Sequence, residues 1–115
     1  MNTPVSFEIA KVLKEKGFNI PQLYFYIDGD ISWKVDNTRC RNQIEGEYAA
    51  PTIAEVVMWL YEKHGIWINC NIAPNFETFS CYVVHKKLGG YDTEEFNSPT
   101  EAFSEAIEYT LKNLI

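Results

Sequence analysis

The sequence of 115 residues lacks any apolar run of the ~18 residues that a membrane-spanning helix needs. Its first residues, Met1-Asn2-Thr3-Pro4, have neither the basic region nor the apolar region of a secretory signal. Cysteine is scarce and odd in number (Cys40, Cys70 and Cys81), which does not suit a compact disulfide framework. These absences predict a soluble, cytoplasmic protein that does not associate with membranes.

Sequence motifs for nucleotide binding and for zinc binding are also missing. The six glycines form neither Gly-x-Gly-x-x-Gly nor a phosphate-binding loop, so no nucleotide cofactor is expected. There is no Cys-x-x-Cys or His-x₃-His pair of the kind that structural zinc sites usually show. The sequence therefore predicts no cofactor.

Lys and Arg are fewer than Asp and Glu, and the net charge is −6. The whole excess lies between Asp92 and Glu108, where six acidic residues occur without a Lys or Arg. This pattern argues against binding to nucleic acid, which depends on clustered Lys and Arg. A hydrophobic fraction of 46% and an aromatic fraction of 15% instead predict one packed domain, residues 1–115.

Three helices are indicated by their end signals. The first is expected to start with Thr3 as the cap and Pro4 at the first helical position. Gly17 is expected to end it, with Phe18 folding back on Leu13 in a Schellman motif.

The second helix is expected to begin at Pro51 or Thr52, because Thr52 and Glu55 have capping-box spacing, and to end at Gly65. Its predicted apolar face holds Ile53, Val56, Val57, Leu60 and Tyr61. The third helix is expected to start at Ser98-Pro99-Thr100-Glu101, which combines a cap, a proline at the first position and a capping-box Glu. Its apolar stripe runs to the C-terminus.

Two hairpins alternate with these helices. Residues 24–27 and 30–35 are β-rich and are joined by Asp28-Gly29, a strong signal for a type I′ turn. Residues 36–50 are expected to form a loop with a short strand near 43–48. Residues 66–72 and 78–88 predict the second hairpin, which is broken at Gly89-Gly90.

The order helix, hairpin, helix, hairpin, helix predicts an α+β fold. We expect a two-layer arrangement, with an antiparallel sheet and helices mainly on one of its faces. The repeated order also raises the alternative of an internal duplication of a helix–hairpin unit.

One candidate metal site can be drawn from the second hairpin. Cys70 and Cys81 are expected to lie opposite each other, with His85 further along the same strand and His64 as a possible fourth ligand. The alternative is that Cys70, which alternates with isoleucines, is a small buried hydrophobe. His64 also has a structural role available, since a positive charge suits the last turn of a helix.

No catalytic constellation emerges from the remaining residues. Cys40 lies between Arg39 and Arg41, which would lower a thiol pKa, but it has no evident base. The carboxylate pairs Glu94-Glu95 and Asp28/Asp30 have no apolar surroundings that would fit them for acid–base work.

Two kinds of surface remain as candidate interaction sites. Glu101, Glu105 and Glu108 fall on one side of the third helix. The alternative is that they form an ordinary solvent-exposed face without a binding role. The aromatic candidates are Trp59, Trp67, Tyr24 and Tyr26, which would form a contact patch if several were exposed together. Their alternative role is to seal the edges of a small core.

Three blocks of the sequence resemble a group of known proteins: Asn2–Lys11, Pro51–Leu60, and Ser98–Ala102 with Ala106–Tyr109. They are similar to small uncharacterised proteins encoded in gut Bacteroides-type genomes and in their phages or mobile elements. The resemblance implies an accessory protein acting in the bacterial cytoplasm. It implies no activity, and no functional residue transfers from it.

The resulting hypothesis is a non-catalytic module that binds a protein partner or itself, as a homodimer. The alternative is a small ligand- or metal-binding protein or enzyme that uses Cys70, Cys81 and His85. An acidic mimic of nucleic acid is a third class.

Overall fold

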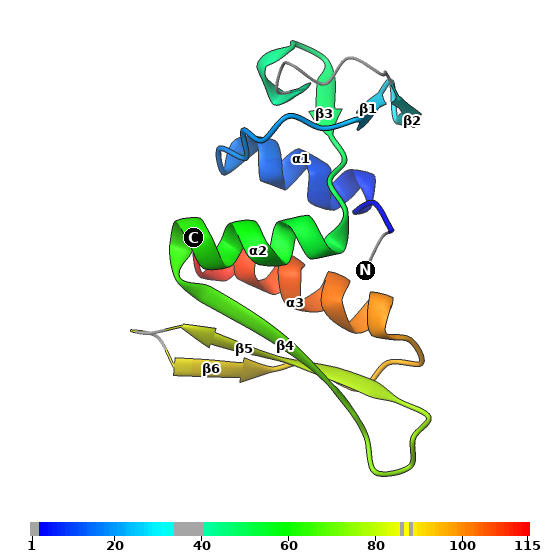
Figure 1. The fold of residues 1–115 in the computed structure, drawn as a ribbon, viewed down its shortest axis with the longest axis vertical. Helices are drawn as coiled ribbons and strands as arrows, with labels where there is room; N and C mark the ends of the chain where they lie inside the picture. Colours follow the sequence, from blue (N-terminus) through cyan, green and yellow to red (C-terminus); the bar gives the residue numbers. More distant parts are fainter. Residues whose placement is uncertain (1–2, 34–40, 86, 88) are drawn as a thin grey trace. The chain divides into compact units, whose positions relative to one another are not determined.

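The computed structural model describes residues 3–33, 41–85, 87 and 89–115. In these residues the chain forms three α-helices and two three-stranded antiparallel sheets (Figure 1). It is therefore an α+β protein, as the sequence predicts. The expected single sheet is wrong, because each of two compact units, Asn2–Thr52 and Ile53–Ile115, contains a sheet of its own. The prediction of one domain stays a prediction.

The first unit begins with α1 (Phe7–Glu15), which starts later than predicted. Ser6 is its N-cap, and the Ser6 hydroxyl accepts a hydrogen bond from the Ile9 N–H at 3.3 Å. Thr3 and Pro4 do not start the helix, because Pro4 forms a β-bridge with Thr52 and the Val5 N–H donates to the Pro51 carbonyl. A long-range backbone contact thus holds this segment extended.

The end of α1 is the predicted Schellman motif. Gly17 has φ +86°, and the Phe18 N–H donates to the Leu13 carbonyl at 3.0 Å. The Gly17 N–H donates to the Lys14 carbonyl, and the Phe18 side chain is buried. The helix therefore ends where glycine alone takes the left-handed conformation without strain.

The first sheet has the strand order β2-β1-β3. Strands β1 (Tyr24–Ile27) and β2 (Asp30–Trp33) form the predicted hairpin, with φ +52° at Asp28 and +84° at Gly29. After the 3₁₀ turn η1 (Arg41–Gln43), strand β3 (Glu47–Ala49) pairs with the other edge of β1. This is the short strand expected near 43–48, displaced toward the C-terminus. Residues 34 and 35 of the predicted second strand lie outside the described part.

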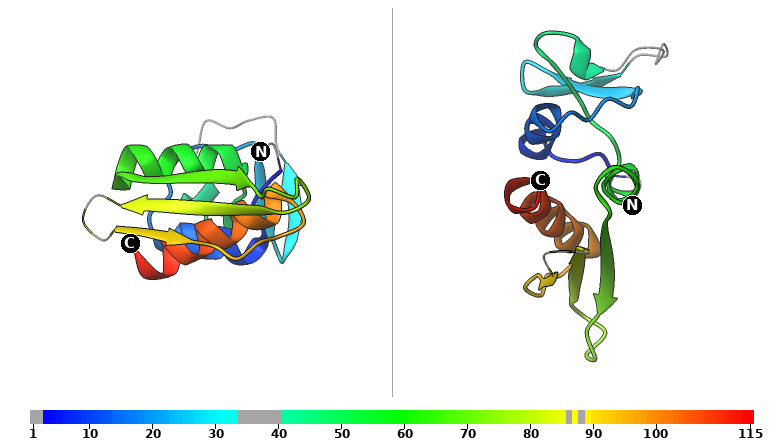
Figure 2. Two further views of the ribbon diagram at one scale, coloured as in Figure 1. Left: turned by 90° about the horizontal axis from the view of Figure 1, so that it is seen from below. Right: turned by 90° about the vertical axis from the view of Figure 1, so that its left-hand side faces the viewer.

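The second unit comprises α2 (Ile53–His64), β4 (Ile66–Ile72), β5 (Phe79–His85), β6 (Gly89–Asp92) and α3 (Pro99–Asn113). Its strands are ordered β4-β5-β6, and α2 and α3 lie behind the sheet in Figure 2 (left). Gly65, with φ +66°, ends α2 as predicted. The Ser98 hydroxyl caps α3 by accepting from the Glu101 N–H at 3.2 Å, also as predicted.

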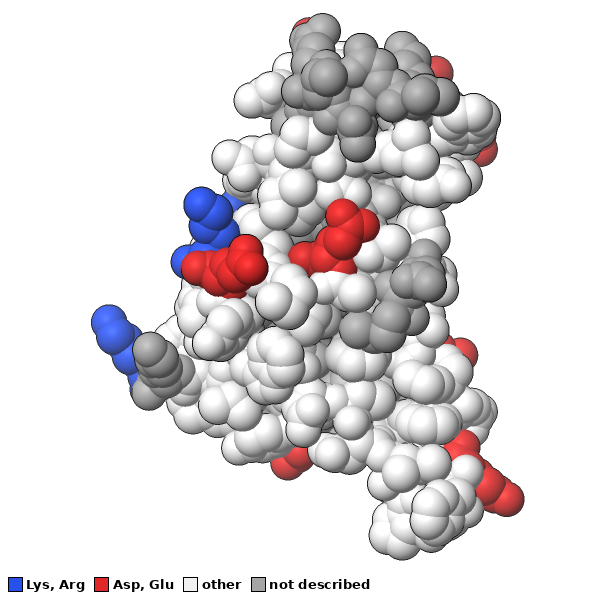
Figure 3. Space-filling model, viewed as in Figure 1, with Lys and Arg blue, Asp and Glu red and all other residues white. Residues whose placement is uncertain are grey.

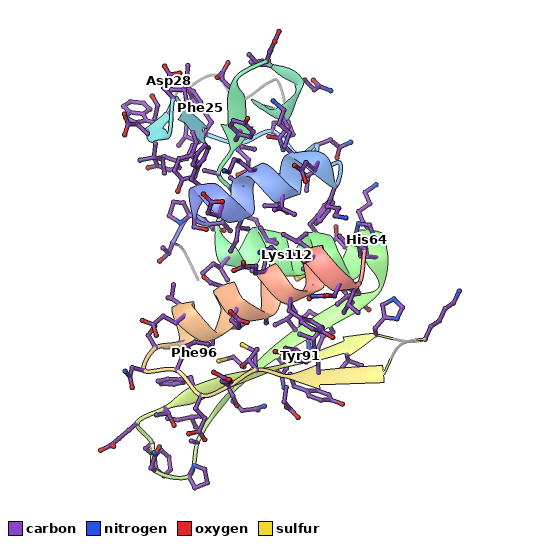
Figure 4. All side chains as sticks on the ribbon, turned by 180° about the vertical axis from the view of Figure 1, so that it is seen from behind. Phe25, Asp28, His64, Tyr91, Phe96 and Lys112 are labelled. Carbon is purple, nitrogen blue, oxygen red and sulfur yellow. The ribbon has the colours of Figure 1, made fainter. Side chains whose placement is uncertain are left out.

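Burial alternates along β4 and β5, as expected for a sheet with one covered face. The residues that fill the core of this unit come from both helices and from the inner face of the sheet. They are Ile53, Val56, Val57, Leu60, Ile66, Ile68, Cys81, Val83, Ala102, Ala106, Ile107 and Leu111. Tyr91 of β6 stacks on Tyr109 of α3 with ring centroids 3.7 Å apart, which ties the third strand to the helix (Figure 4).

The two sheets have different topologies. In the first sheet the central strand is the first of the three in the chain, and in the second sheet it is the middle one. An internal duplication would have kept one order, so the strand orders do not support it.

Candidate interaction surface

The face of the second sheet that points away from α2 and α3 carries a group of apolar side chains. Trp67 of β4 lies directly opposite Val84 of β5, and Tyr82 is the diagonal neighbour of Trp67 on that face. Their exposed fractions are 42% for Trp67, 42% for Val84 and 38% for Tyr82. Tyr61 of α2 joins them, with its ring edge-on to Trp67 at 5.5 Å. We call Tyr61, Trp67, Tyr82 and Val84 the open-face cluster.

Gly90 of β6 makes room for one member of this cluster. A Cβ atom at this position would lie 2.0 Å from the Tyr82 hydroxyl oxygen and 2.3 Å from Cζ. The phenol ring therefore lies across the glycine, and a larger residue would push it aside. Gly90 thus sets the orientation of an exposed aromatic ring.

Sequence reasoning found only Trp67 among these four residues. The alternation of β5 contains the signal for Tyr82 and Val84, since they fall between Cys81, Val83 and His85 on the opposite face. Tyr61 falls on the predicted apolar face of α2, which implies burial, whereas the structure leaves it 54% exposed. Of the open-face cluster, only Tyr61 thus needs the packing of α2 to be identified.

The prediction that Trp59 belongs to an exposed aromatic patch is wrong. Its side chain is only 3% exposed, and its ring packs edge-on against His64 with 5.0 Å between centroids. Trp59 and Tyr61 thus exchange the roles predicted for them, because the buried side of α2 is centred nearer Val56 and Leu60. The Trp59 ring is therefore a buried side chain and not part of an exposed patch.

The other two aromatic candidates belong to the first unit. Tyr24 is 43% exposed and pairs across the hairpin with the more exposed Trp33. Tyr26 is half-buried: its hydroxyl donates to the Val5 carbonyl at 2.7 Å, and its ring contacts Phe7 at 5.3 Å. Tyr26 therefore fixes the segment before α1.

The turn between β4 and β5 presents the most exposed large apolar side chain of the described residues. Phe76 is 77% exposed and has φ +59°, which is unusual for a residue with a Cβ. The Ala73 N–H donates to the Thr78 carbonyl, and the Asn75 side chain accepts from the Glu77 N–H at 2.8 Å. The turn is thus well bonded, and no sequence pattern indicated the exposure of this phenylalanine.

The acidic side of α3 is less uniform than predicted. Glu101 is exposed, Glu105 and Glu108 are half-buried, and Glu108 forms an ion pair with Lys112 one turn further on. On the face drawn in Figure 3, acidic side chains lie in separate groups. This surface is therefore a weaker candidate than the open-face cluster.

The structure confirms that Cys70 and Cys81 lie opposite each other, but it separates His85 from them. His85 is four strand residues beyond Cys81, roughly 13 Å at ~3.3 Å per residue. Ligands of one zinc ion must all lie within ~2.3 Å of it. In the described part of the chain, no three His, Cys, Asp or Glu residues are grouped to hold a metal ion.

His64, at the end of α2 in Figure 4, does not favour the positive charge that its position suggests. Burial lowers its pKa below the ordinary value of 6.5, and the charge of Lys63 lowers the pKa further. Both effects outweigh the attraction of the helix C-terminus.

We predict that His64 makes the protein less stable in acid. Its folded pKa lies below its unfolded pKa, so the unfolded chain takes up the proton first as the pH falls. The contribution of neutral His64 to the free energy of unfolding is therefore complete above about pH 6.5. It is lost as the pH falls through the lowered pKa. Urea unfolding between about pH 7.5 and about pH 5 should show a smaller loss for His64→Gln than for the unchanged chain. Equal losses in the two proteins would contradict this assignment.

The remaining candidates add no site. Cys40 and Arg39 lie outside the described residues, so the structure does not bear on them. Asp28 is the first residue of the two-residue turn in the first hairpin, and Asp30 directly follows that turn. Glu95 accepts a hydrogen bond from the Thr78 hydroxyl at 3.2 Å, which is a structural role beside the turn that carries Phe76.

Comparison of the chain with protein families, with curated proteins and with solved structures finds no match. Among the described residues, no helix has the length and apolar character needed to cross a membrane.

Proposed function

We propose that this protein is a non-catalytic interaction module that binds a second copy of itself through the open-face cluster. The observation that carries the proposal is the exposure of Trp67, Tyr82 and Val84 as neighbours on a sheet face that α2 and α3 leave uncovered. Tyr61 of α2 is also exposed and extends the group through its edge-on contact with Trp67. Side chains of this size are normally buried, and their exposure as a group is typical of contact surfaces.

The residue types support a protein ligand. Trp and Tyr are the residues most enriched at the energetic centres of protein interfaces, because they bury a large area and keep a polar group for hydrogen bonding. Here one Trp and two Tyr lie within one patch, and Gly90 holds the Tyr82 ring across the sheet. A partner would therefore bind to a surface on which the aromatic rings already have fixed orientations.

The charge distribution supports a second copy as that partner. Two copies with a net charge of −6 repel each other over most of their surfaces. The outward residues of the second sheet are almost uncharged, however: beside the cluster they are Asn69, Asn71, Ser80, Gly90 and Asp92. The edge strand β4 contains no charged residue at all. Two such faces meet with little repulsion, and a two-fold axis would place each cluster on its own counterpart.

The test is the solution mass of the full chain, measured by sedimentation over a wide range of concentrations. We expect a reversible dimer, and we expect Trp67→Ala to raise its dissociation constant about thirtyfold, the equivalent of an interface hot spot of ~2 kcal/mol. Gly90→Ala should weaken the dimer as well, because it displaces the Tyr82 ring without changing that residue.

Phe76→Asn is the matched control. It also removes an exposed aromatic ring, but from a turn that lies beyond the end of β4, and β4 alone extends ~17 Å past Trp67. The control should dimerise like the unchanged chain. A chain that stays monomeric at every concentration, or a dimer that only Phe76→Asn disrupts, would overturn the proposal.

The resemblance of the three helix-bearing blocks extends the proposal to a biological setting. A small module that associates through one sheet face fits an accessory protein of a phage or mobile element, acting in the bacterial cytoplasm. This setting stands on the resemblance alone.

A further inference from the structure

Cys70 and Cys81 are paired in the closest arrangement that two antiparallel strands offer. They lie directly opposite each other in β4 and β5. The Cys81 N–H donates to the Thr93 hydroxyl at 2.9 Å, and the Cys81 carbonyl accepts from the Thr93 N–H at 2.9 Å. Both backbone groups of Cys81 therefore point away from β4, which makes Cys70 and Cys81 a non-hydrogen-bonded pair.

This type of pair brings the two Cα atoms to about 4.5 Å, inside the range of roughly 4.4–6.8 Å that disulfides span. The two side chains share the inner face of the sheet. Both cysteines are free. A covalent bond between them thus requires adjustment of the side chains rather than a new backbone arrangement.

The two thiols differ in their access to solvent. Cys81 is fully buried, whereas Cys70 lies on the edge strand and is only half-buried. Burial, together with the neighbouring Cys70, raises the pKa of Cys81 to about 12. A reagent in solution therefore meets Cys70 first, and Cys81 reacts only with a group already attached to Cys70.

We propose that Cys70 and Cys81 form a dithiol site that a low-molecular-weight disulfide oxidises to an intramolecular disulfide. The Cys70 thiolate attacks the reagent RSSR, forms a mixed disulfide and releases one RS⁻. The Cys81 sulfur then attacks the Cys70 sulfur and releases the second RS⁻. Two cysteine thiols and one RSSR give one protein disulfide and two RSH, so the two thiol protons end on the released thiols.

The bond would join the two strands on the helix-facing side of the sheet. It is independent of the open-face cluster, because Cys70 and Cys81 point to the opposite face. The closed ring includes the turn that carries Phe76, so oxidation reduces the freedom of the unfolded chain between the two cysteines. A higher urea midpoint after oxidation is the expected consequence.

The experiment uses the full chain with Cys40→Ser, which leaves only the proposed pair. After incubation with oxidised glutathione, the protein is unfolded and alkylated, and its mass and peptides are measured. We expect the mass to fall by two hydrogen atoms, both thiols to resist alkylation, and one peptide to link Cys70 with Cys81. Dithiothreitol should restore both thiols and the original urea midpoint.

Cys40→Ser combined with Cys70→Ser is the matched control, since Cys70 is the more exposed member of the pair. Its circular dichroism should match that of the parent, and its remaining Cys81 should stay a free thiol under the same treatment. Persistent glutathione on Cys70, a disulfide between two chains, or two thiols that remain open to alkylation would each overturn the proposal.

Discussion

Replacement of Ile68 by alanine is expected to lower the free energy of unfolding by about 2–5 kcal/mol. Ile68 lies on the inner face of β4 and is 2% exposed, opposite Val83, which is 1% exposed. Truncation removes buried methyl groups and leaves a cavity between the sheet and the helices of the same unit. Because α2 and α3 also use this core, the loss should be close to that of other fully buried isoleucines.

Ile72→Ala provides a control with the same chemical change on the same face of the same strand. Ile72 is 48% exposed, so its truncation should cost less than about 1 kcal/mol. Urea unfolding of both variants, followed by circular dichroism, makes the comparison. Equal losses would mean that the core extends along the whole of β4, contrary to the burial pattern of that strand.

The ends of the elements were well predicted wherever one local group determines them. Gly17 and Gly65 end their helices with positive φ, Asp28-Gly29 makes the hairpin turn, and Ser98 caps α3. In each case a side chain or a backbone conformation acts within four residues. Such local effects can be predicted from the neighbouring residues alone, without knowledge of the rest of the chain.

The predictions that failed depend on contacts between distant residues. The start of α1 was misplaced because the backbone of Val5 pairs with Pro51, far away in the sequence. Strand β6 was missed because its first residues are Gly89 and Gly90, which have low strand propensity, and it is held by pairing with β5 and by the stack of Tyr91 on Tyr109. Secondary-structure propensity does not predict an element whose position is determined by tertiary contacts.

The open-face cluster could be predicted from the sequence only where local alternation determines exposure. Trp67 could be placed on an outer face because the alternation of β4 is visible in the sequence. The exposure of Tyr61 and the burial of Trp59 depend on which side of α2 packs against its unit, and both residues are aromatic. Helical spacing places them on neighbouring sides but does not say which side is covered.

Phe18→Ala is expected to cost about 3–5 kcal/mol, the range for a buried phenylalanine. The side chain is 1% exposed and follows the helix-ending glycine of α1. The bond from the Phe18 N–H to the Leu13 carbonyl uses the backbone and survives the substitution, so the loss measures side-chain packing alone. Phe76→Ala is the matched control: Phe76 is 77% exposed, and its truncation should change the stability by about 0.5 kcal/mol or less.

Measured together, Phe18→Ala and Ile68→Ala also test the prediction of a single domain. The two residues lie in different compact units. If residues 1–115 unfold cooperatively, calorimetry should give one transition, with a calorimetric enthalpy equal to the van't Hoff enthalpy, and both substitutions should lower its temperature. Two transitions, of which each variant shifts only one, would contradict a single domain and assign each unit its own stability.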